Sequence, residues 1–112
     1  MAGLLEGVKV VDLTHYLSGP YCTKLLATLG ADVVKIERRS GDRMRRFGPF
    51  ACESPLNSHL EHGARQNLFL ASHGKNELES GAWFLYLNTS KQSVTLDLKS
   101  HLGKEILLKL VQ

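Results

Sequence analysis

The sequence lacks the features of several large protein classes. It has two cysteines in 112 residues, Cys22 and Cys52, too few for the disulfide framework of a small secreted protein. No apolar run approaches the roughly 20 residues needed to cross a bilayer. Residues 1–10 also lack the basic start and long apolar core of a signal peptide. These absences favour a protein without a membrane partner, and we expect a cytoplasmic location, with mitochondrial and peroxisomal locations as open alternatives.

The excess of positive charge is small. Fourteen Lys and Arg face 11 Asp and Glu, which gives a formal net charge of +3. That excess does not argue for a nucleic-acid partner. The arginines are nevertheless concentrated between positions 38 and 46, where they would suit an anionic small ligand if they converge. A solvated run of charges is the alternative. The residues concerned are Arg38, Arg39, Arg43, Arg45 and Arg46.

Histidine and cysteine are present, but not in a convincing metal-binding pattern. His59 and His62 have the spacing of metal ligands on a helix, and His73 follows them. No arrangement of cysteines or acids completes a zinc set, so we predict no metal site and a surface role for these histidines. Cys22 lies in an expected apolar helix, and we predict that its side chain is a small buried hydrophobe.

The first third of the chain has the pattern of a strand, a helix and a second strand. A short β-branched run at 8–13 predicts a strand buried on both faces of a sheet. Pro20 suits the start of a helix, expected over 20–29, and Gly30 suits the left-handed conformation that ends it. A second β-branched run predicts a strand at 32–36. The residues expected to form the apolar stripe of the helix are Leu25, Leu26 and Leu29.

This βαβ unit, residues 8–37, predicts an α/β fold with a Rossmann-like parallel sheet, because such crossovers are nearly always right-handed. Residues 51–80 show little pattern, and we predict a long surface excursion that is either a functional lid or an insertion. Beyond it we expect one or two helical turns at 82–87, a third strand at 94–98 and a final helix at 101–111. The chain stops where an α/β protein would continue into another strand, so we expect one incomplete three-layer domain.

The loop between the first strand and its helix has the best placement for a ligand. Open parallel sheets bind ligands at the carboxyl ends of their strands, and a helix start offers unpaired N–H groups to an anion. Here that loop is Thr14–Gly19, and Arg38 follows the second strand at the same edge, where its guanidinium suits a phosphate. His15 is a candidate general base, although the sequence pairs no nucleophile with it.

Two acidic residues near this edge are weaker candidates for a role in catalysis or ligand binding. We expect Asp12, at the end of the first strand, to bond to loop backbone. Glu37 stands where dinucleotide-binding folds keep an acid for ribose, but the first turn reads L-S-G-P-Y and lacks G-x-G-x-x-G, which weakens that reading. The aromatic residues that we expect in the core are Trp83, Phe84 and Tyr86.

Five segments match a known pattern in the right order. They read L-x-G-V-K-V-V-D-L-T at 5–14, S-G-P-Y-C-T-x-L-L-A-x-L-G-A-D-V-V-K-I-E at 18–37, S-G-D at 40–42, F-L-Y-L-N-T-x-K-x-S-V-T-L-D-L-K at 84–99 and G-K-E-I-L-x-K-L-V at 103–111. Together they resemble the start of the family III CoA-transferases, the group that includes carnitine and bile-acid CoA-transfer proteins and formyl-CoA:oxalate CoA-transferase. About two thirds of the chain is covered.

The resemblance implies a cleft for coenzyme A. Its residues would be Tyr16, Leu17, Ser18, Arg38, Leu96 and Lys99. The first three would line the cleft, partly through backbone groups, with the loop from His15 to Leu17 supporting catalysis. The arginine would bind the nucleotide phosphate end of coenzyme A, and the last two residues would lie near the adenine and its phosphates.

The resemblance also implies an activity, which is transfer of coenzyme A from an acyl-CoA to a carboxylic acid through an aspartyl-CoA thioester. The family's aspartate comes after position 112, so this chain would be a CoA-binding amino-terminal portion without a nucleophile, and inactive alone. Full-length members form interlocked homodimers. The alternative is a non-catalytic nucleotide-binding or interaction remnant of the same fold.

Overall fold

The structure is a computed structural model that describes residues 3–48 and 81–112. Its elements are β1 (Lys9–Asp12), α1 (Ser18–Thr28), β2 (Asp32–Glu37), the 3-10 helix η1 (Arg43–Arg46), α2 (Ala82–Leu87), β3 (Gln92–Thr95) and α3 (His101–Leu110). The predicted excursion at 51–80, with its three histidines and Cys52, lies outside the described residues. No helix in the described part is long and apolar enough to cross a membrane.

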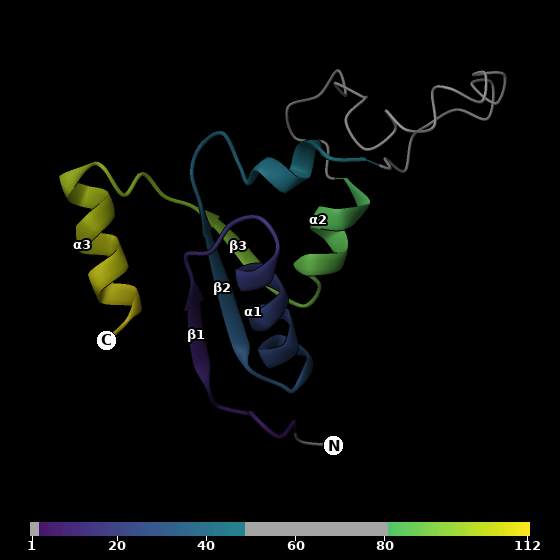
Figure 1. Ribbon diagram of the computed structural model, residues 1–112. Helices are drawn as coiled ribbons and strands as arrows, with labels where there is room; N and C mark the ends of the chain where they lie inside the picture. The colour runs from purple at the N-terminus through teal and green to yellow at the C-terminus, as the bar shows by residue number, and fades with distance from the viewer. Residues whose placement is uncertain (1–2, 49–80) are drawn as a thin grey trace, which may run out of the picture.

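The three strands form one parallel sheet in the order β1-β2-β3 (Figure 1). Val11 pairs with Val34 between the first two strands, and Ile36 pairs with Val94 between the second and third. The helix α1 connects β1 to β2 and packs against both. The predicted α/β fold with a parallel βαβ start is confirmed, and β2 is the central strand of the described sheet.

Most element boundaries differ from the predicted ones by one or two residues, and one element was not predicted. The third strand runs from Gln92 to Thr95; it starts two residues earlier than expected, because Gln92 already pairs with Val34, and ends three residues earlier. In the predicted loop after β2, the chain turns at Gly41 and forms η1, whose start is capped by the Asp42 side chain accepting from Met44 N at 3.0 Å. The helix α2 has the expected bounds.

The buried face of α1 includes only one of the three predicted leucines, Leu26, which is partly buried against the core. Leu25 and Leu29 are 46% and 45% exposed, and Cys22 is exposed, so the prediction of a buried thiol is wrong. The Thr23 hydroxyl instead faces the sheet and donates to the Asp12 carboxylate at 2.6 Å, which fixes the rotation of the helix. The residues that α1 buries are Pro20, Thr23 and Ala27.

The three-layer arrangement is present only in part. On one face, a small core joins Ala27 of α1 and Ala31 to Val33 of β2. The helix α3, by contrast, does not pack closely on the sheet. It stands beside the sheet in Figure 1, and Gly103 is the only residue that it buries. Val8 and Leu13, the two ends of the predicted first strand, are 44% and 46% exposed, so the prediction that this strand is buried on both faces is wrong. Val94 of β3 is 41% exposed, which leaves apolar sheet surface bare.

A second core joins η1 to α2, far apart in sequence. Met44, Phe84 and Leu87 are buried together, and Phe47 and Trp83 pack against them. The approach of the two segments is close enough to require a glycine. A Cβ on Gly81 would lie 1.7 Å from the carbonyl oxygen of Phe47, and the Gly81 N–H donates to the Arg45 carbonyl at 3.0 Å. This contact positions the aromatic side chains described below.

Candidate functional site

Three segments meet at the carboxyl edge of the sheet, and each carries predicted binding residues. The loop after β1 holds His15 to Ser18, Arg38 directly follows β2, and the segment after β3 runs from Leu96 to Lys99. The second and third segments are tied together, because Leu96 N donates to the Glu37 carbonyl at 2.9 Å. Arg38 and Lys99 are exposed, and Leu96 is half-buried. The loop after β1 and Arg38 lie at the same edge, as predicted, whereas Leu96, which was expected inside the third strand, follows β3.

The loop after β1 has an unusual backbone. Tyr16 has a φ of 77°, a conformation that non-glycine residues rarely adopt and that concentrates at functional sites. Leu17 precedes the first helical residue of α1 and provides no side-chain cap for the free N–H groups of the first turn. Gly19 is needed for packing within the loop, since a Cβ there would lie 2.4 Å from the Thr14 side chain. The loop presents Tyr16 and Leu17 outward, each 51% exposed.

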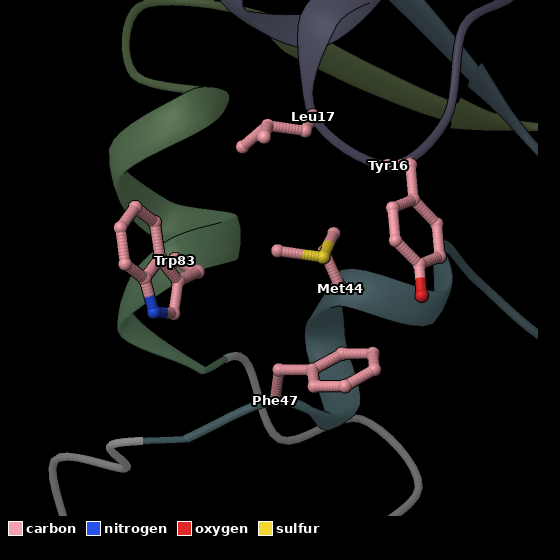
Figure 2. A pocket seen from close by; sticks show the side chains of 5 residues that line it. All are labelled: Tyr16, Leu17, Met44, Phe47 and Trp83. Atoms are coloured by element: carbon pink, nitrogen blue, oxygen red, sulfur yellow. The ribbon is translucent and has the colours of Figure 1, made fainter. Parts of the chain in front are cut away.

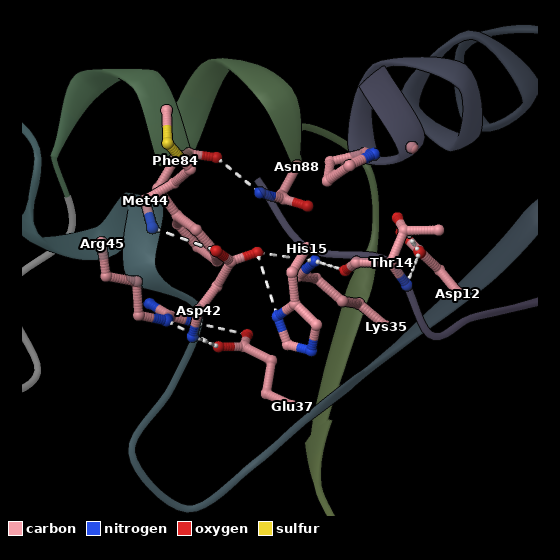
Figure 3. Close-up of polar contacts among 12 residues, drawn as sticks. Asp12, Thr14, His15, Lys35, Glu37, Asp42, Met44, Arg45, Phe84 and Asn88 are labelled. Carbon is pink, nitrogen blue, oxygen red and sulfur yellow. Dashed lines mark hydrogen bonds and ion pairs between the residues drawn. The ribbon is translucent and has the colours of Figure 1, made fainter. Parts of the chain in front are cut away.

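The carboxylate of Asp12 holds this loop in place through hydrogen bonds. It accepts from Thr14 N at 2.8 Å (Figure 3). It also accepts from the Thr23 hydroxyl at 2.6 Å and from Lys91 Nζ at 3.0 Å. Lys91 also donates to the Pro20 carbonyl at 2.8 Å. Burial alone would raise the pKa of Asp12, but these hydrogen bonds outweigh it and lower the pKa to about 2. The predicted structural role of Asp12 is confirmed.

A second buried pair lies beside the first. Lys35 Nζ is 3.0 Å from Asp42 Oδ2 and donates to the Thr14 carbonyl at 2.7 Å, with both charged side chains almost completely buried. His15 Nδ1 faces the same Asp42 oxygen at 3.6 Å, which is too long for a hydrogen bond (Figure 3). His15, the candidate general base, therefore sits at the edge of an ion pair rather than beside an identified nucleophile.

One arginine of the cluster between positions 38 and 46 is paired with a buried carboxylate, and the others are exposed. Arg45 makes a two-pronged contact with Glu37, from Nε to Oε2 at 2.8 Å and from Nη2 to Oε1 at 2.7 Å. Burial alone would raise the pKa of Glu37, but Arg45 and Ser93 outweigh it and lower the pKa to about 2. Glu37 is 3% exposed, which leaves it unavailable to a ribose. The exposed arginines are Arg38, Arg39, Arg43 and Arg46.

An apolar cavity of about 210 Å³ opens beside the loop (Figure 2). Its lining comes from the β1–α1 loop, from the η1 segment and from α2, and consists of Tyr16, Leu17, Met44, Phe47 and Trp83. The rings of Tyr16 and Phe47 meet edge to face, with their centroids 6.2 Å apart. Leu17 and Trp83 lie on the same side of the gap in Figure 2. The cavity adjoins two of the predicted binding residues.

The aromatic residues of α2 do not share one role. Phe84 is buried, as predicted. Trp83 is only partly buried and lines the cavity. Tyr86 is 51% exposed, with Lys24 Nζ 3.3 Å from its ring centroid, so its predicted place in the core is wrong. Met44 and Phe47 were not predicted as part of the site, although their spacing of three within R-M-R-R-F is a signal for one apolar face.

Comparison with known proteins decides the family. The family model described as CoA-transferase family III matches residues 5–112. The chain belongs to CoA-transferase family III. It is 37% identical over 110 residues to a succinyl-CoA:mesaconate CoA-transferase from Haloarcula hispanica. The aligned region covers 98% of this chain and 22% of that protein. It is 40% identical over 111 residues to a formyl-CoA:oxalate CoA-transferase from Streptomyces coelicolor. That aligned region covers 99% of this chain and 21% of the relative.

Solved structures place the fold in the same family. A CAIB/BAIF family protein from Brucella suis superposes with a TM-score of 0.71 and 32% identity, over 99% of this chain and 24% of that chain. The CoA-transferase family III chain described here spans about a fifth of the length of the curated relatives that it matches. Membership implies thioesters of coenzyme A as substrates at the level of the family.

Proposed function

We propose that this chain forms the coenzyme A-binding part of an acyl-CoA:carboxylate CoA-transferase. The observation that supports the proposal most strongly is the convergence of three loops at one edge of the parallel sheet. The loop from His15 to Ser18, Arg38 and the segment from Leu96 to Lys99 come from three different strands. Such an edge is where open α/β sheets bind nucleotides. Coenzyme A is the ligand, with an acyl-CoA as donor and a carboxylic acid as acceptor.

Each segment has chemistry suited to one part of coenzyme A. The uncapped start of α1 offers backbone N–H groups to an anionic oxygen next to Ser18. The exposed guanidinium of Arg38 suits a phosphate, and the exposed ammonium of Lys99 adds positive charge beyond Leu96. We place the phosphates of coenzyme A near Arg38 and the thioester near Tyr16 and Leu17. This placement defines the orientation of the ligand along the edge of the sheet.

The covalent step needs a carboxylate nucleophile, and the resemblance to the family implies that this nucleophile lies outside the chain. A carboxylate nucleophile attacks the acyl carbonyl and expels the CoA thiolate, which leaves an acyl anhydride on the enzyme. The thiolate then attacks the enzyme's own carbonyl carbon and releases the carboxylate product, which leaves an enzyme–CoA thioester. Asp12 and Asp42 are both buried in ion pairs with lysines. We therefore place the nucleophile outside residues 1–112, in an interlocked homodimer of the full-length enzyme.

Calorimetric titration with coenzyme A tests the binding role. Arg38→Ala should weaken binding by roughly 1.5 to 3 kcal/mol, the range for losing a charge-assisted hydrogen bond. The loss should be smaller for dephospho-CoA if the guanidinium contacts the ribose phosphate. Arg39→Ala is the matched control, because the neighbouring side chain is also exposed. Equal losses from both substitutions would indicate general attraction to positive charge, and no loss from either would reject the assignment.

The second candidate function is a nucleotide-binding or interaction remnant that has kept the fold without the reaction. The burial of Asp12 and Asp42 in ion pairs is the observation that favours it. A nucleotide-binding remnant would also bind coenzyme A, so binding alone does not separate it from the transferase. The reading frame after Gln112 does: continuation into a family-type aspartate supports the transferase, whereas a stop codon with no companion gene supports the remnant.

A further inference from the structure

We propose that the apolar cavity beside Tyr16 holds the acyl group of the donor thioester, and that this acyl group is apolar. The inference rests on the proposed function, because it takes coenzyme A to lie along the loop from Tyr16 to Ser18. The cavity opens at that loop, and two of its five lining residues, Tyr16 and Leu17, belong to it. A ligand that reaches this loop with its thioester end brings its acyl group to the mouth of the cavity.

The lining determines which acyl group fits. Leu17, Met44 and Phe47 carry no polar side-chain atoms that hydrogen-bond strongly, and no charged side chain lines the cavity among the described residues. A terminal carboxylate placed there would lose its hydration without gaining a cationic partner, which is strongly unfavourable. Arg45 of η1 is already engaged by Glu37. The cavity therefore discriminates against dicarboxylic acyl groups.

The size of the cavity sets the length of the acyl group. A dry cavity of about 150 Å³ is enough to bind benzene, and this cavity is about 210 Å³. A benzoyl group or a straight chain of about six carbons fits that space. Each methylene that leaves water should tighten binding about fourfold. The relatives named for succinyl-CoA, mesaconate and oxalate act on polar acids, so this specificity would set the chain apart from them.

Trp83 provides a direct readout, because it is the single tryptophan of the sequence and it lines the cavity. The experiment titrates the chain with coenzyme A, butyryl-CoA, hexanoyl-CoA and succinyl-CoA while tryptophan fluorescence and heat are recorded. We expect hexanoyl-CoA to bind at least tenfold more tightly than coenzyme A and succinyl-CoA. We also expect the emission of Trp83 to shift with the acyl forms and to change little with coenzyme A itself.

A matched pair of substitutions locates the effect. Leu17→Gln introduces a neutral polar group at the rim, where the side chain is 51% exposed and folding is not at risk. It should reduce the advantage of hexanoyl-CoA over coenzyme A, taken as the ratio of the two affinities measured in the same variant, at least fivefold. Leu108→Gln makes the same change at a position on α3 that is 61% exposed and away from the cavity, and should leave the advantage intact.

The outcomes separate this inference from the proposed function. If coenzyme A binds and hexanoyl-CoA binds no more tightly, the acyl assignment is wrong and the binding role of the chain stands. Tight binding of succinyl-CoA, equal to that of hexanoyl-CoA, would likewise overturn it. If no CoA species binds, both proposals fall. An equal response of Leu17→Gln and Leu108→Gln would place the acyl group outside the cavity.

Discussion

Lys35 and Asp42 form an ion pair that is almost completely withdrawn from water, with Nζ 3.0 Å from Oδ2 and side-chain exposures of 1% and 0%. The lysine projects from the central strand, and the aspartate caps η1 through its other oxygen, which accepts from Met44 N. One charge pair thus attaches the segment that carries the cavity lining to the sheet. It also supports the loop after β1, because Lys35 donates to the Thr14 carbonyl.

The first prediction follows from this burial. Lys35→Met should lower the free energy of unfolding by about 3 to 5 kcal/mol, because it leaves the Asp42 carboxylate buried without its partner. The double variant Lys35→Met/Asp42→Asn should lose less than the single one, since the amide is neutral and keeps an oxygen for the cap. Lys104→Met, at an exposed position on α3, is the control. Urea denaturation followed by circular dichroism measures all three, and a double variant no more stable than Lys35→Met would contradict the pairing.

The second prediction concerns acid. Asp12 and Glu37 have their pKa lowered to about 2 from ordinary values of 3.8 and 4.5. The folded chain therefore binds fewer protons than the unfolded chain in this range, and the stabilisation is present above about pH 4.5 and lost as the pH falls toward 2. Each carboxylate contributes on the order of 2 to 3 kcal/mol. Urea midpoints should change little between pH 6 and about pH 5 and should fall from there to pH 3.

A variant isolates the contribution of one carboxyl group. Glu37→Gln should remove part of the acid dependence, because the amide does not titrate. Glu105→Gln on α3 should leave the dependence unchanged, since that side chain is about half exposed and its contact with His101 is 3.6 Å. An unfolding free energy that stays constant between pH 5 and pH 3 in the unmodified chain would show that neither carboxylate is held in its charged form.

The third prediction tests the contact between η1 and α2. Gly81→Ala would place a Cβ at 1.7 Å from the Phe47 carbonyl oxygen, so the backbone must separate there. We expect a loss of about 1 to 3 kcal/mol in stability and a red shift in Trp83 emission, because Trp83 moves away from Phe47 and Met44. Ala82→Ser, at the exposed neighbouring position, should change neither quantity. Unaltered emission in Gly81→Ala would mean that the cavity lining does not depend on this approach.

Local patterns predicted much of this fold, whereas pairings between distant residues did not follow from them. The strand at Asp32–Glu37 and the helix after Pro20 were found because β-branched runs and helix-start signals are local. Lys35 looked like an ordinary strand residue, because its partner lies beyond a turn that brings Asp42 back over the sheet. The rotation of α1 escaped prediction for a similar reason. Its leucines suggested the buried face, but the hydrogen bond from Thr23 to Asp12 determines it.

The location of the site was more predictable than its lining. The rule that ligands bind at the carboxyl ends of parallel strands indicated the loop with Tyr16 and the position of Arg38. The cavity required the meeting of Phe47 with Trp83, which are 36 positions apart in the sequence. Neither residue lies in a strand or follows one directly. Only the folded chain brings them together, through the second core under η1 and α2.

The last prediction is negative and concerns the reaction. Residues 1–112 alone should form no covalent CoA adduct when incubated with an acyl-CoA, because none of the four aspartates is a suitable nucleophile. Asp12 and Asp42 are buried and paired with lysines, and Asp32 begins β2 at the edge opposite the site. Asp97 is exposed at the correct edge, but its carboxylate accepts from Lys99 N and lies in open solvent, without a closed oxyanion site.

The test is trapping with hydroxylamine or borohydride, followed by mass spectrometry of the chain. We expect unmodified protein with hexanoyl-CoA and with succinyl-CoA, while calorimetry under the same conditions shows coenzyme A bound. Asp97→Asn is the control for the most accessible carboxylate and should behave as the unmodified chain does. Because Asp97 combines exposure with the correct edge of the sheet, an adduct there, lost in Asp97→Asn, would move the nucleophile into this chain and overturn its assignment to a later segment.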